Sequence, residues 1–141
     1  MKHTDLMLND LVMYQGKILR VGCISDYDIK IDLFEDGEDT PYAEIWQEEL
    51  DEVEPIPLTA EILEKNGFEE KTESSPFVYY LFKDGDNSVS LEHTYDTTDK
   101  EDYWACSIGN RLCDVCTISM HYIHELQHAL RLCGVDKEIV L

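Results

Sequence analysis

The chain is organised around one stretch, Ser119-Met-His-Tyr-Ile-His-Glu-Leu-Gln-His-Ala-Leu-Arg-Leu-Cys-Gly134. This stretch is the longest run with helical periodicity, which predicts a helix that begins at Ser119 and ends at Gly134. On a helical wheel, Ile123, Leu126 and Leu130 share one apolar arc. We therefore expect the helix to cover a sheet with these aliphatic side chains.

The same stretch contains a short motif typical of zinc peptidases, His124-Glu125-Leu126-Gln127-His128. In those enzymes, two imidazoles one helical turn apart bind the metal and the glutamate activates the metal-bound water. The wheel places His121, His124 and His128 on the polar arc with Arg131, so we expect these side chains to face water. Imidazoles stacked in this way could take up transition metals adventitiously.

The long-range context of the motif does not match a peptidase. Extended signatures place a glycine and a third histidine downstream, where this chain has Arg131 and Gly134. We therefore predict no catalytic residue, no cofactor and no dedicated metal site. The alternative is a zinc-dependent hydrolase that uses His124, Glu125 and His128.

Charge is the strongest compositional feature of the 141 residues. The chain has 31 acidic and 11 basic residues, a formal net charge of −20. The acidic excess is spread over both halves, and such a field repels phosphate backbones, so we expect no direct binding of nucleic acid. It suits a basic protein partner, a DNA mimic that inhibits a nucleic-acid-binding protein, or simple solubility.

Several features indicate a cytoplasmic protein. No apolar run approaches the roughly 20 residues of a membrane span, and the N-terminus lacks the apolar core of a signal peptide. The five cysteines form no regular pattern, which favours reduced thiols.

Residues 1–56 are predicted to form an all-β module. Hydrophobic alternation and turn residues indicate five short strands, at 11–14, 18–24, 28–33, 42–46 and 52–56. On the second strand, Leu19, Val21 and Cys23 are expected to share one face. Five strands in about fifty residues favour a closed or nearly closed small barrel.

The first hairpin of this module resembles a known group of folds. The pattern Asn9-Asp10-Leu11-Val12-x-Tyr14-x-Gly16-Lys17-x-x-x-Val21 is similar to the opening of SH3-like and ribosomal KOW-type barrels. The resemblance implies an SH3-like barrel over residues 1–56. Because the nucleic-acid-binding members are basic and this segment is acidic, the resemblance does not extend to the ligand.

Residues 57–141 are predicted to form an α+β module, an antiparallel sheet flanked by two helices. The first helix spans 60–66, with Thr59 as N-cap and Gly67 as its end. Strands are expected at 77–82, which we place centrally, and at 88–95, 103–108 and 112–118. Turns are expected at 84–87 and at Gly109-Asn110, with an acidic loop at 96–102.

Two further patterns have the composition of metal sites. Cys113 and Cys116, followed by His121 and His124, have the residue types of a zinc finger, but on one strand the two thiols would point to opposite faces. The stretch 84–88 is similar to a calcium loop, yet Val89 and Tyr95 occupy the positions that need glycine and glutamate. We interpret the first as inert thiols and the second as a turn.

Two blocks, Pro-Ile-Pro-Leu-Thr-Ala-Glu-Ile-Leu-Glu-Lys-Asn-Gly-Phe at 55–68 and His-Glu-Leu-Gln-His-Ala-Leu-Arg-Leu-Cys-Gly at 124–134, resemble signature blocks of a known group. The group comprises small uncharacterised proteins of Bacteroidales genomes, prophages and phages. Its members often carry Asn at the position of His128, which argues against a catalytic ligand there. The resemblance implies an architecture and a source, and we expect a non-enzymatic cytoplasmic module that binds a protein partner, connected with phage or prophage biology.

Overall fold

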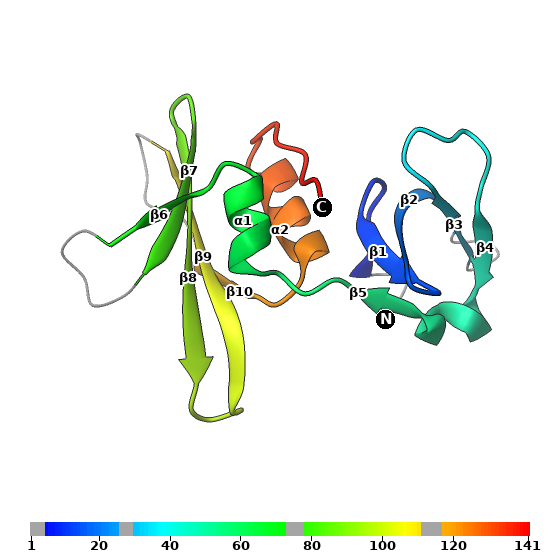
Figure 1. The fold of residues 1–141 in the computed structure, drawn as a ribbon, viewed down its shortest axis with the longest axis horizontal. Coiled ribbons are helices and arrows are strands. Elements are labelled where there is room, and N and C mark those ends of the chain that lie inside the picture. Colours follow the sequence, from blue (N-terminus) through cyan, green and yellow to red (C-terminus); the bar gives the residue numbers. More distant parts are fainter. Residues whose placement is uncertain (1–4, 26–29, 73–77, 111–116) are drawn as a thin grey trace. The chain divides into compact units, whose positions relative to one another are not determined.

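The computed structural model describes residues 5–25, 30–72, 78–110 and 117–141, with Asn110 described by its backbone alone. The chain divides into two compact units, Met1–Ile56 (unit 1) and Pro57–Leu141 (unit 2). Each contains a five-stranded antiparallel sheet, and the helices are short (Figure 1). The predicted α+β class is confirmed. None of the helices in the described ranges has the length and apolar character needed to cross a bilayer.

The sheet of unit 1 has the strand order β4-β3-β2-β1-β5. A 3-10 helix, η2 (Gln47–Glu52), connects β4 to β5. All five predicted strands are found, with ends that agree to within one residue, except that residues 28 and 29 of the strand predicted at 28–33 lie outside the described residues. The strands are β1 (Leu11–Tyr14), β2 (Lys17–Ser25), β3 (Lys30–Phe34), β4 (Ala43–Trp46) and β5 (Val53–Pro55).

One β-bulge changes which side chains of β2 enter the core of unit 1. Leu19 and Val21 share the buried face, but Cys23, predicted to lie on the same face, is exposed, and Ile24 packs against the core instead. The pairing of β2 with β3 shifts register between Val21 and Cys23. A bulge adds one residue to the strand, so the alternation of faces reverses beyond it.

Gly22 sits in the bulge because a side chain would not fit there. A Cβ atom at this position would lie 2.3 Å from two carbons of the Phe34 ring. The ring therefore packs directly on the glycine backbone. Such a close approach is one of the few situations in which a strand requires glycine.

Unit 2 contains two helices and a sheet in the order β10-β9-β8-β7-β6. Its strands are β6 (Glu69–Lys71), β7 (Tyr79–Asp84), β8 (Asn87–Asp96), β9 (Glu101–Asn110) and β10 (Thr117–Met120). Its helices are α1 (Ala60–Lys65) and α2 (Ile123–Leu132).

One face of this sheet carries the hydrophobic core of unit 2. Figure 1 shows α1 and α2 on one side of the sheet. The buried strand residues Tyr80, Val89, Leu91, Trp104, Cys106 and Met120 share one face by register. Ile123, Leu126 and Leu130 of α2 are completely buried, as their apolar arc predicted.

Two predictions for the strands of unit 2 are wrong. β7 is an interior strand between β8 and β6, but Tyr80 is its only buried residue, so the expected cover on both faces is wrong for the described part of the run at 77–82. Gly109 and Asn110 form no turn, because both belong to β9 and pair with Ser88 and Asn87. Of the strand predicted at 112–118, residues 112–116 lie outside the described residues.

The ends of α1 follow from local sequence signals, as predicted. The Thr59 hydroxyl accepts a hydrogen bond from the Ile62 amide (3.3 Å), and Gly67 has a φ of +80°. The buried Asn66 then fixes the chain end to this helix. Its side chain donates to the carbonyls of Ile62 and Val140 and accepts from the Val140 amide.

We predict that Gly22→Ala lowers the free energy of unfolding by about 1–3 kcal/mol, because the new methyl group would overlap the Phe34 ring. Urea denaturation of the full chain measures this. In a Phe34→Ala background the same substitution is expected to cost much less, because the opposing ring is gone. An equal cost in both backgrounds would contradict the assigned contact.

Candidate functional site

Helix α2 begins later than its periodicity suggests. The predicted start at Ser119 is wrong, because Ser119 and Met120 pair with Ala105 and Trp104 in the sheet. The N-cap is Tyr122, so His121 lies ahead of the helix. The three imidazoles therefore do not form a continuous row on one helical face.

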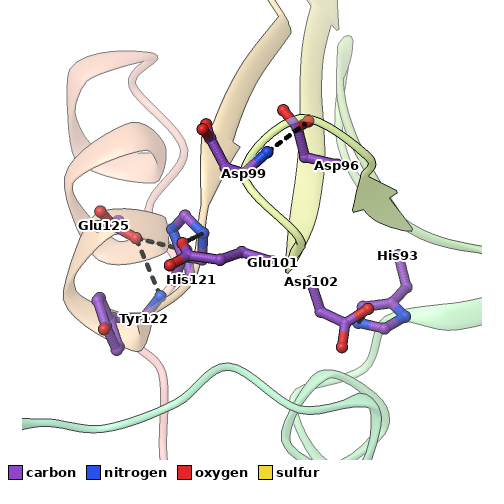
Figure 2. Close-up of polar contacts among 8 residues, drawn as sticks. All are labelled: His93, Asp96, Asp99, Glu101, Asp102, His121, Tyr122 and Glu125. Carbon is purple, nitrogen blue, oxygen red and sulfur yellow. Dashed lines mark hydrogen bonds and ion pairs between the residues drawn. The ribbon is translucent and has the colours of Figure 1, made fainter.

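The glutamate of the peptidase-like motif caps this helix. One carboxylate oxygen of Glu125 accepts hydrogen bonds from the amides of His121 (2.6 Å) and Tyr122 (2.9 Å), as Figure 2 shows. A carboxylate at this position satisfies amides that have no partner within the helix and interacts favourably with the helix dipole. A catalytic base must instead reach the attacking water. The geometry gives Glu125 a structural role.

The first histidine of the motif is buried, contrary to the prediction that it faces water. His124 is only 5 % exposed. Its ring stacks on Tyr122 at 5.8 Å and meets the His128 ring edge-on at 5.7 Å. Pro57 pairs with Tyr122 in an isolated β-bridge, so the segment around Pro57 lies beside the first turn of α2. Helical periodicity cannot reveal this contact, because Pro57 is far away in the sequence. His128 itself is half-buried.

The surroundings of these histidines do not resemble a metal centre. Within the described residues, no three His, Cys, Asp or Glu side chains converge on a point that could hold a metal ion. His121 and His93 each approach a single carboxylate at 4.0 Å, that of Glu101 and that of Asp102 respectively (Figure 2). Cys113 and Cys116, of the zinc-finger-like pattern, lie outside the described residues.

The buried thiol of Cys106 is poorly placed for catalysis. Burial raises the pKa of the Cys106 thiol to about 12, with a smaller contribution from Cys133, so Cys106 is protonated and unreactive at neutral pH.

A shallow cavity of about 210 Å³ lies at β6 and β7, lined by Gly67, Glu69, Lys71, Leu81, Phe82 and Lys83. None of its lining residues belongs to α2.

The turn between β8 and β9, together with the strand ends beside it, carries four carboxylates, which we call the acidic tip: Asp96, Asp99, Glu101 and Asp102. The Asp96 side chain accepts from the amides of Thr98 (2.6 Å) and Asp99 (3.3 Å), which fixes the turn. These hydrogen bonds lower the pKa of Asp96. The side chains of Glu101 and Asp102 are 70 % and 66 % exposed. The sequence indicated this acidic loop but not the fixed geometry of its turn.

We predict that Glu125→Ala lowers the free energy of unfolding by about 1 kcal/mol, because two helix-end amides lose their acceptor. Glu125→Gln should cost less, since an amide oxygen can still accept. Urea denaturation measures both. The control is Glu64→Ala at an exposed position of α1, expected within about 0.5 kcal/mol of the parent. Equal effects at both positions would contradict the capping role.

We also predict that the motif on α2 holds no zinc, because its glutamate caps the helix and its first imidazole is packed between rings. Untagged protein would be loaded with zinc, desalted and subjected to elemental analysis, in parallel with His128→Asn. The zinc content is expected to be the same in both. A stoichiometric ion present in the parent and lost from His128→Asn would restore the hydrolase hypothesis.

Comparisons with protein families, with curated proteins and with solved structures found no match for this chain. The functional assignment therefore depends on the geometry and charge of the residues described above.

Proposed function

We propose that this chain is a non-enzymatic, cytoplasmic protein-interaction module that binds a basic protein partner. The observation that carries the proposal is the acidic tip, in which a turn fixed by two hydrogen bonds holds the partly exposed Asp96 close to three exposed carboxylates, in a chain with a net charge of −20. The capping role of Glu125 and the protonated Cys106 thiol support a binding function over catalysis.

The charge of the chain would act in two ways on such a partner. The overall negative field would speed the encounter with a basic surface, over a range limited by a Debye length of about 8 Å at physiological salt. At contact, complementary charges mainly determine specificity and orientation. A turn held by two backbone hydrogen bonds presents its carboxylates without a large entropic cost of ordering.

We further propose that unit 1 is an SH3-like barrel and that the chain belongs to the Bacteroidales, prophage and phage group whose blocks it resembles. The strand order β4-β3-β2-β1-β5 supports the first point, because β1 pairs with both β2 and β5 and thus joins the ends of the unit. The nine-residue buried cluster that includes Leu6, Val53 and Leu50 is the compact core such a barrel needs.

The proposal predicts that Asp99→Lys/Asp102→Lys weakens partner binding by about tenfold or more, because attraction to a basic surface becomes repulsion. Immobilised full-length chain would capture proteins from a Bacteroidales lysate at low salt. Mass spectrometry would then quantify each protein released by about 0.5 M salt, which screens surface charges.

The matched control is Asp36→Lys/Glu48→Lys, which makes the same change in net charge at two exposed positions of unit 1. A basic protein retained by the parent and the control but lost from the tip variant is the expected result. Equal loss from both variants would show a nonspecific charge effect, and salt-independent capture would contradict an electrostatic partner.

A further inference from the structure

Residues 135–141, drawn in red in Figure 1, form a segment without regular secondary structure that follows α2. We call this segment the strap. Its aliphatic side chains Val135 and Ile139 are buried, at 3 % and 4 % exposed. Between them, the Lys137 ammonium lies 5.5 Å from the centre of the Phe82 ring. The strap is therefore packed against unit 2 along its length.

The side chain of Asn66, at the end of α1, anchors the far end of the strap. Its amide nitrogen donates to the carbonyls of Ile62 and Val140, both at 2.8 Å. Its amide oxygen accepts from the Val140 backbone amide at 2.9 Å. Asn66 is 1 % exposed, so water does not substitute for these partners. A buried polar group without a partner is costly, and this site therefore requires an amide side chain.

The residue after this anchor is Gly67, and this is the one Asn-Gly step in the sequence. Asparagine is among the chemically labile residues. A following glycine favours the loss of its amide, because no Cβ shields the backbone nitrogen that attacks the side chain. The most labile asparagine of the chain is thus the one that holds the strap.

The reaction needs only water as a co-reactant. The Gly67 nitrogen forms a bond to the side-chain carbonyl carbon of Asn66 and loses its proton, while the bond from that carbon to Nδ2 breaks and ammonia leaves. Water then opens the resulting five-membered imide at either of its carbonyl groups. The product carries aspartate or isoaspartate at position 66.

Both reacting groups are held in place while the strap is docked. The Gly67 amide donates to the Glu64 carbonyl at 3.0 Å, and the Asn66 side chain is fixed by Ile62 and Val140. Helix α1 has only six residues, so its order depends on tertiary contacts more than on helix propensity. Undocking of the strap removes the contact with Val140 and lets the end of α1 fray. Local opening of this kind exposes groups that the closed fold protects.

We propose that Asn66 is a deamidation site whose reaction is controlled by the strap, and that the reaction releases the strap permanently. Aspartate at this position has no amide hydrogens to donate. Its ionised carboxylate would face the carbonyl oxygens of Ile62 and Val140, which are also acceptors. A buried charge opposite two acceptors is unfavourable, so the strap does not dock again.

Release of the strap changes the surface of unit 2. Val135 and Ile139 leave their buried positions, and Lys137 leaves the Phe82 ring. An extended segment that is no longer packed is the preferred substrate of proteases. Deamidation would thus convert an aged copy of the chain into one with a cleavable, partly apolar segment.

Ageing of the full chain at mildly alkaline pH tests the control by the strap. Peptide mapping by mass spectrometry measures the rate of deamidation at Asn66, and a synthetic peptide of residues 60–72 gives the rate without the fold. The parent should react about tenfold or more slowly than the peptide, because only its open fraction reacts. Ile139→Asp places a charge at a buried position and should bring the rate close to that of the peptide.

The matched control is Val140→Asp, which makes the same change in charge one residue further along. The Val140 side chain is 55 % exposed and only its backbone contacts Asn66, so this variant should react like the parent. Ile139→Ala loosens the strap without a charge and should give a smaller rise. The rate at Asn87, which precedes a serine, reports global unfolding in the same samples and should not change.

Limited proteolysis tests the release of the strap. An endoproteinase that cuts after lysine is applied to Asn66→Asp, which carries the reaction product, and to the aged parent. Cleavage after Lys137 should be about tenfold or more faster in both than in the fresh parent, because the cleavage rate follows the open population. Val140→Asp should be cut as slowly as the fresh parent. Far-UV circular dichroism checks that each variant is folded.

Four results would each overturn the proposal. They are a parent that deamidates at the rate of the peptide, an Ile139→Asp chain that reacts no faster than Val140→Asp, a rise at Asn87 equal to the rise at Asn66, and an Asn66→Asp chain that is cut as slowly as the fresh parent. None of these measurements involves a basic partner, so this proposal and the proposed function fail independently.

Discussion

The hydrogen bonds from the amides of His121 and Tyr122 to the Glu125 carboxylate are the interaction on which the interpretation of unit 2 depends. They fix where α2 begins, directly after the strand β10 that delivers the chain to it. They also occupy the group that a metallopeptidase would need for its water. A single carboxylate cannot serve both purposes, because capping points it along the helix axis toward backbone amides.

The features that the sequence predicted correctly are those with local causes. Thr59 caps α1 and Gly134, with a φ of +70°, ends α2, because each residue type suits its own backbone geometry. The features that it did not predict have partners far along the chain. Helical periodicity could not show that Ser119 pairs with Ala105, nor that Pro57 pairs beside the first turn of α2 and helps to explain the burial of His124.

The bulge in β2 is another feature that the sequence could not fully predict, because it also depends on a partner strand. Strict alternation from Leu19 to Cys23 predicts that Leu19, Val21 and Cys23 share one face, yet the Phe34 ring occupies the space above Gly22 and the strand adds a residue there. A glycine in a strand pattern is a recognised sign of such a bulge. The ring that packs on Gly22 is determined by the pairing of β2 with β3. The glycine alone therefore could not predict that Cys23 is exposed to solvent.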